Sequence, residues 1–74
     1  MSWRTRYWPA DPAFYTKEQK RVLSALPDWV PMHFEMRECP GVVNVCLVLE
    51  HRRSADRARV FRSGRMVASV PAAV

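Results

Sequence analysis

The side chains of His33, Glu35 and Arg37 occupy alternate positions in the segment MHFEMRE. If the segment is a strand, all three point to one side, because side chains alternate between the two faces of a sheet. With Arg57 and Arg59 on the same face, they would supply an acid/base pair and phosphate-binding cations, the parts that a compact ribonuclease needs. Polar residues on a sheet face more commonly meet only water, so ribonuclease activity ranks third among the hypotheses. We expect no enzyme and no catalytic residue.

Two histidines and two cysteines raise the question of a zinc site: His33, Cys39, Cys46 and His51. His33 and Cys39 are six residues apart on one extended segment, which separates them by roughly 20 Å. Tetrahedral zinc needs every ligand within about 2.0–2.3 Å of the metal, and the paired short spacings of zinc sites are missing. A Cys39–Cys46 disulfide fails because the strand register sets Cys46 opposite Glu35. We therefore expect two free thiols and no metal or cofactor.

The chain carries a formal net charge of +5, and ten of its twelve cations are arginines, six of them within residues 50–66. Arginine forms bidentate contacts with phosphate and carboxylate, so such a chain favours nucleic acid, an anionic membrane surface or an acidic protein as partner. Arg52 and Arg53 belong to an exposed loop, HRRSAD, whereas Arg57 and Arg59 share one strand face. Because the arginines are divided among two or three surfaces, nucleic-acid binding by an arginine-rich sheet face and loop ranks second.

Binding to a protein partner ranks first. The chain is too short to hold an enzyme pocket comfortably, and its strand VVNVCLVLE is apolar on both sides. If one helix covers one face, Val42, Cys46 and Val48 stay partly exposed on the other, and an apolar strip bordered by arginines suits an interface. We expect a regulator, inhibitor or subunit that occupies its partner's surface. The predicted partner-binding residues, chosen because Trp and Arg dominate interface hot spots, are Trp3, Trp8, Arg52, Arg53, Arg57 and Arg59.

Length and composition predict one small domain, 1–74, of which 49% is hydrophobic and 26% charged. No export signal is visible, because the N-terminal arginines are followed by Trp-Pro and Asp-Pro rather than by an apolar segment. The longest apolar run, Val45–Leu49, is far shorter than the roughly 20 residues of a spanning helix. We therefore expect a cytoplasmic protein that has reduced thiols and no membrane partner.

Residues 1–15 form an aromatic arm that contains five of the eight aromatic residues. Alternation from Trp3 to Trp8 permits a short strand, and the following prolines favour extended or turn backbone. The aromatic rings would either lie over the core or grip a partner.

A single helix is predicted over residues 16–26. Thr16 can cap its N-terminus, Gln19 completes a capping box, and Pro27 ends it. The inward stripe of this helix is predicted to be Val22, Leu23, Ala25 and Leu26.

Residues 32–50 predict a β-hairpin, because Pro40 and Gly41 suit the two central positions of a type II turn. With Cys39 opposite Val42, one face carries only apolar pairs, as a buried face requires. These pairs are Met36–Val45, Phe34–Leu47 and Met32–Leu49. The pairs on the other face are Arg37–Asn44, Glu35–Cys46 and His33–Val48.

A second hairpin is predicted from residues 57–62 and 65–70 around a two-residue Ser63-Gly64 turn. This turn sets Val60 opposite Val67 and Phe61 opposite Met66. The buried face stays open at this point, since one candidate holds Ala58, Val60 and Val67, and the other holds Phe61, Met66, Ala68 and Val70.

The predicted fold is therefore an α+β two-layer sandwich, in which one N-terminal helix packs on a four-stranded antiparallel meander, 32–70, preceded by the arm. So small a core rarely contributes more than about 3–5 kcal/mol of net stability. Because neither a disulfide nor a metal adds to it, we expect a homodimer or another constitutive complex.

Overall fold

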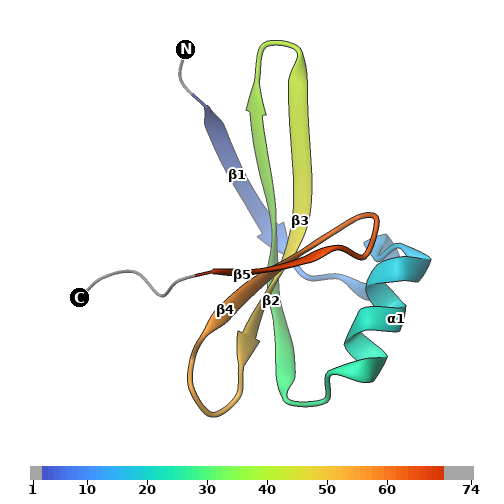
Figure 1. The fold of residues 1–74 in the computed structure, drawn as a ribbon. Coiled ribbons are helices and arrows are strands. Elements are labelled where there is room, and N and C mark those ends of the chain that lie inside the picture. The colour runs from blue at the N-terminus through green and yellow to red at the C-terminus, as the bar shows by residue number, and fades with distance from the viewer. Residues whose placement is uncertain (1–2, 70–74) are drawn as a thin grey trace.

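The computed structural model describes residues 3–69. Within them lie one α-helix, one 3-10 turn and five strands, which are in chain order β1 (Arg4–Pro9), η1 (Pro12–Phe14), α1 (Lys17–Ala25), β2 (Trp29–Cys39), β3 (Val42–His51), β4 (Arg57–Phe61) and β5 (Met66–Ser69). The strands form one antiparallel sheet in chain order, a meander (Figure 1). The α+β class and the meander are confirmed. The sheet has five strands rather than four, because part of the aromatic arm pairs with β2 as β1.

Strand β1 divides the aromatic arm into a packed part and an exposed part. Trp8 lies opposite Phe34 and stacks on its ring, with 5.4 Å between ring centroids, so this indole covers the core. Trp3 and Tyr7 are 45% and 61% exposed. Only Trp8 among these three rings therefore has the core-covering role.

Helix α1 is one residue shorter at each end than the predicted 16–26, because Thr16 and Leu26 are its N-cap and C-cap. The Thr16 side chain accepts from Gln19 N–H while the Gln19 side chain accepts from Thr16 N–H, so the capping box is formed. The predicted inward stripe is wrong at Ala25, which is exposed. The most buried helix residue is Gln19, whose amide Nε2 donates to the Val60 carbonyl oxygen at 3.2 Å. One glutamine thus caps the helix and ties it to β4.

The β2–β3 hairpin has the predicted register from Cys39–Val42 to His33–Val48, around a turn in which Gly41 has a φ of 85°. The prediction is wrong at Met32. Pro31, not Met32, lies opposite Leu49, and the pairing shifts between Pro31 and His33. Met32 is the extra residue of this bulge and is 43% exposed. A proline has no N–H to donate, so sheets tolerate it beside such irregularities.

The predicted register of the β4–β5 hairpin is wrong by one residue, because Val60 lies opposite Met66. Gly64 has a φ of 89°, and its N–H donates to the Phe61 carbonyl oxygen at 2.9 Å. This is a three-residue loop with a left-handed glycine rather than the expected two-residue turn. Of the two candidate buried faces, the one with Ala58 and Val60 is correct at these two residues, which are fully buried. It is wrong at Val67, which lies opposite Arg59 on the other face and is 42% exposed. The predicted end of this hairpin at Val70 lies outside the described residues.

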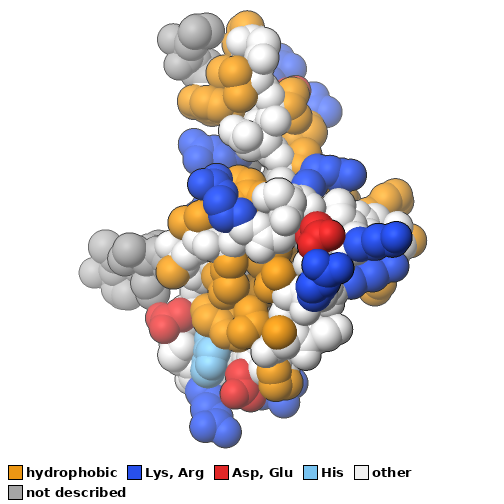
Figure 2. Space-filling model, turned by 45° about the vertical axis from the view of Figure 1, so that its right-hand side comes forward, with side chains coloured by type: hydrophobic (Ala, Val, Ile, Leu, Met, Phe, Trp, Pro, Cys, Tyr) orange, Lys and Arg blue, Asp and Glu red, His pale blue; other side chains and the backbone are white. Residues whose placement is uncertain are grey.

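The sheet has an inner face, against α1, and an outer face. The inner face carries the core cluster of Phe34, Leu47, Leu49 and Val60, and α1 contacts β4. The tip of the β2–β3 hairpin extends beyond the helix together with β1 (Figure 1). Hydrophobic side chains also gather at this tip, at the top of Figure 2, where Val42 and Val43 are 46% and 60% exposed. The outer face carries the side chains that alternate with the core residues: Tyr7, His33, Glu35, Arg37, Cys46, Val48, Arg57, Arg59 and Phe61.

Candidate functional site

The six predicted partner-binding residues do not form one surface. Trp3 precedes β1, and Arg52 and Arg53 follow β3. The start of β1 and the end of β3 lie at opposite ends of the sheet (Figure 1). Arg57 and Arg59 share one strand face, as predicted, and it is the outer face, whereas Trp8 lies on the inner face. The molecule therefore has two separate candidate sites, a pocket on the inner face and a polar cluster on the outer face.

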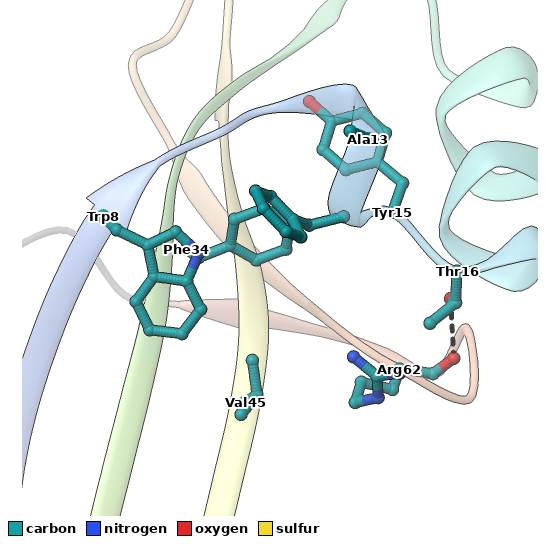
Figure 3. A pocket seen from close by; sticks show the side chains of 8 residues that line it. Trp8, Ala13, Tyr15, Thr16, Phe34, Val45 and Arg62 are labelled. Carbon is teal, nitrogen blue, oxygen red and sulfur yellow. Dashed lines mark hydrogen bonds between the residues drawn. The ribbon is translucent and has the colours of Figure 1, made fainter.

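The aromatic pocket lies where α1 stops covering the inner face, and its volume is about 600 Å³. Its lining comes from β1, the η1 turn, β2, β3 and the β4–β5 turn: Trp8, Ala13, Phe14, Tyr15, Thr16, Phe34, Val45 and Arg62. Figure 3 shows the rings of Trp8, Phe34 and Tyr15 grouped on one side. The Arg62 side chain extends toward them from the β4–β5 turn.

Specific contacts hold the pocket walls in place. The Tyr15 ring meets Phe34 edge-on at 5.8 Å, and its hydroxyl donates to the Ala10 carbonyl oxygen at 3.1 Å. Burial, followed by the negative charge of Asp11, raises the pKa of the Tyr15 hydroxyl, so this donor stays protonated. The Thr16 hydroxyl donates to the Arg62 carbonyl oxygen at 2.8 Å and joins the helix N-terminus to the turn (Figure 3). Phe14 is 61% exposed beside the opening.

Sequence reasoning found Trp8 but missed the rest of this pocket. Arg62 was not among the predicted partner-binding residues, and Phe14 and Tyr15 were part of the undivided aromatic arm. The capping box was the one available signal, since it fixes where Thr16 lies and hence where the preceding rings enter the fold. The contact between Thr16 and Arg62 spans 46 residues, which no local pattern encodes.

The outer face is organised around an ion pair that crosses the central strand. The Glu35 carboxylate on β2 accepts from Arg59 on β4, with 3.1 Å between Oε1 and Nε and 3.5 Å between Oε2 and Nη2. Strand β3 runs between them, so this pair lies over Cys46 and Val48. Both are only 4% exposed, which contradicts the predicted apolar strip at these two positions. Only Val42 of the expected strip is exposed.

The Cys46 thiol lies beneath this pair, with its Sγ 3.9 Å from Glu35 Oε1. Burial, followed by the adjacent Glu35 charge, raises the pKa of the Cys46 thiol to about 11, although Arg59 and Arg37 oppose the shift. The thiol is therefore protonated at neutral pH and a poor nucleophile.

The geometric condition for a ribonuclease is met in part. Arg57 and Arg59 do share a face with His33, Glu35 and Arg37. The Glu35 side chain is only 7% exposed and is bound by Arg59, however, so its carboxylate has little surface left for abstracting a substrate proton. This arrangement favours a structural role for Glu35.

Aromatic and basic side chains border the ion pair on the outer face. The Tyr7 ring meets His33 edge-on at 5.1 Å, and the Arg65 guanidinium lies 4.7 Å above the Phe61 ring. Arg57 makes a loose pair with Glu50, 3.5 Å between Nε and Oε2, and its side chain is 52% exposed. The Arg37 guanidinium lies 5.5 Å from the centroid of the Trp3 ring. The outer face thus combines the rings of Tyr7, Phe61 and Trp3 with several cations.

Both cysteines are free thiols. Among residues 3–69, no three His, Cys, Asp or Glu side chains lie close enough together to hold a metal ion. The helix in this part of the chain is too short and too polar to cross a membrane. Neither a scan of protein-family models nor searches of curated proteins and of solved structures gave a match to the chain.

Proposed function

We propose that this chain is a small non-enzymatic binding protein that acts in the cytoplasm as a regulator, inhibitor or subunit by occupying a partner protein. In this proposal the aromatic pocket receives an apolar or aromatic side chain of the partner. The supporting observation is the pocket itself: about 600 Å³, walled by three packed rings and bordered by Arg62. Binding pockets commonly have volumes of about 300–1,000 Å³, apolar walls and a few polar groups that set orientation.

The pocket also indicates the chemistry of the partner. Arg62 is the one charged residue among its lining residues, so a carboxylate next to the inserted side chain would be favoured. Tyr, Trp and Arg are the residue types that dominate binding energy at interfaces. Trp8 and Tyr15 are already fixed by the fold, so little side-chain entropy would be lost when a partner binds.

Two exposed residues test the proposal without disturbing the core. Phe14→Ala and Arg62→Ala should each weaken partner binding at least about tenfold, as expected of hot-spot residues. The measurement is titration of immobilised protein with cytoplasmic extract after nuclease treatment, with quantification of each captured protein. Val30→Ala and Arg53→Ala are matched controls, because Val30 is 37% exposed at the start of β2, away from the pocket, and Arg53 is exposed in the β3–β4 loop.

The proposal fails if no captured protein distinguishes the pocket variants from the controls. It also fails if Arg53→Ala weakens capture as much as Arg62→Ala, since binding would then follow net charge rather than the pocket.

A further inference from the structure

The outer face of the sheet stays open within the described residues. Helix α1 lies on the opposite side, against β4 (Figure 1). Tyr7, Glu35, Cys46 and Phe61 form one row across four strands, because each lies opposite the next in the register. The Tyr7 and Phe61 positions are therefore three strand spacings apart, about 14 Å at about 4.8 Å per spacing.

The two ends of this row present aromatic rings. Tyr7 is 61% exposed, and its edge-on contact with His33 leaves ring surface open to solvent. Phe61 is half-buried and carries Arg65 over its ring. Base stacking on such rings tolerates any sequence, because every base has a π face.

The cations on this face outnumber the carboxylates. Glu35 pairs with Arg59, and Glu50 pairs with Arg57. These two carboxylates therefore do not neutralise the charges of Arg37 and Arg65. Arg37 is exposed and lies in the row next to Tyr7, because its neighbour across the sheet is Thr5. Arg57 is held only by a loose, half-exposed ion pair, which a phosphate could replace at little cost.

We propose that the outer face binds single-stranded nucleic acid, with Tyr7 stacking on one base, the Arg65 guanidinium that lies over Phe61 offering a second stacking surface, and Arg37 and Arg57 contacting phosphates. A single strand fits because its bases are free to stack on the rings, whereas a duplex keeps them paired inside. The Glu35–Arg59 pair acts as the rigid floor between the two rings. This function uses the opposite face from the aromatic pocket and is independent of it.

Fluorescence anisotropy with labelled 12-residue oligo(U) and oligo(dT) tests the proposal across a series of salt concentrations. Wild-type protein should bind both, and log Kd should rise linearly with log salt. The double variant Arg37→Ala/Arg57→Ala should reduce that slope by about 1.4, since each phosphate contact on a single strand contributes about 0.7. Lys17→Ala/Lys20→Ala removes the same charge from α1, on the other side of the sheet, and should leave the slope nearly unchanged.

A separate pair of variants tests the stacking role of Tyr7. Tyr7→Ala should weaken binding roughly 5- to 150-fold with little change in slope, and Tyr7→Phe should restore it because the ring returns. A preference for oligo(U) would identify RNA as the ligand. Equal affinity for oligo(U) and oligo(dT) would mean that the face recognises the phosphates and bases that RNA and DNA share.

Three outcomes would overturn the proposal: no binding by the wild type at about 50 µM protein and about 50 mM salt, equal effects of the double-arginine and double-lysine variants, or an unchanged affinity of Tyr7→Ala. Phe14→Ala/Arg62→Ala should bind the oligonucleotides normally, so failure here and failure of the pocket proposal are separate results.

Discussion

At the scale of single residues, the ion pair between Glu35 and Arg59 determines how the outer face of the sheet is covered. An apolar central strand is shielded here by two long side chains that meet over it, rather than by a second layer of structure. Alternation in the sequence placed Glu35 opposite Cys46 correctly, and it placed Arg57 and Arg59 on one strand face. It did not reveal the pair, because Glu35 and Arg59 are two strands apart and 24 residues apart in the chain.

Arg59→Ala should destabilise the protein by about 3 kcal/mol, because it leaves a buried carboxylate without a partner. Glu35 is 5% exposed, so water reaches its carboxylate poorly. Urea unfolding followed by circular dichroism measures the change. Arg57→Ala is the matched control on the same strand face, and it should cost less than about 1 kcal/mol since its pair with Glu50 is partly exposed. Equal costs for the two variants would contradict the structural role of the Glu35–Arg59 pair.

The raised pKa of the Cys46 thiol predicts a loss of stability in alkaline solution. Its pKa is raised from 9.0 to about 11 in the folded state, so between these values the unfolded chain binds fewer protons than the folded one. The free energy of unfolding must then fall as pH rises from about 9 to 11, by at most about 2–3 kcal/mol from this group. Cys46→Ala should show a shallower fall in urea titrations at pH 8, 9, 10 and 11. Parallel curves for both proteins would show that Cys46 is not responsible.

At the scale of elements, the sequence predicts best where two local signals agree. The β2–β3 register follows from strict alternation together with a Pro-Gly turn, and both point to the same pairing. The capping box likewise sets the start of α1. The β4–β5 register was misjudged because Ser-Gly fits both a two-residue and a three-residue loop. Only the contact of that loop with α1 distinguishes them, and such a contact depends on tertiary structure.

That contact gives a prediction for the two glycines. Gly41 and Gly64 both have positive φ, so alanine at either position should cost about 1 kcal/mol for the left-handed backbone alone. A Cβ at Gly41 would meet nothing within 4 Å, whereas a Cβ at Gly64 would lie 3.0 Å from Glu18 Cβ. Gly64→Ala should therefore be more destabilising than Gly41→Ala, by a further 1–2 kcal/mol or so. Thermal melts of both variants measure the difference, and a Gly41→Ala cost equal to or above that of Gly64→Ala would contradict the packing of α1 on this turn.

At the scale of the whole molecule, the two edges of the sheet differ. The β1 edge carries Arg4, Arg6 and Pro9, which are residues that hinder pairing with another chain. The β5 edge, MVAS, has no charge and no proline, and Met66 and Val67 are 37% and 42% exposed. An unprotected apolar edge on a chain with so small a core favours pairing with a second copy.

We therefore predict a homodimer in which β5 strands of two copies pair antiparallel. The Phe61 N–H donates to the Arg65 carbonyl oxygen, and peptide groups of antiparallel strands alternate in direction, so those of Ala68 point to the open edge. Ala68→Pro should remove an outward donor without breaking the β4–β5 ladder, and the variant should be monomeric by light scattering at 10–100 µM protein, where we expect the wild type to be dimeric.

Val67→Lys should also weaken the dimer by repulsion between copies, whereas Val43→Lys, at the distant tip, should not. Circular dichroism establishes that each variant is folded. A monomeric wild type at 100 µM, or a folded Ala68→Pro dimer, would exclude assembly through β5.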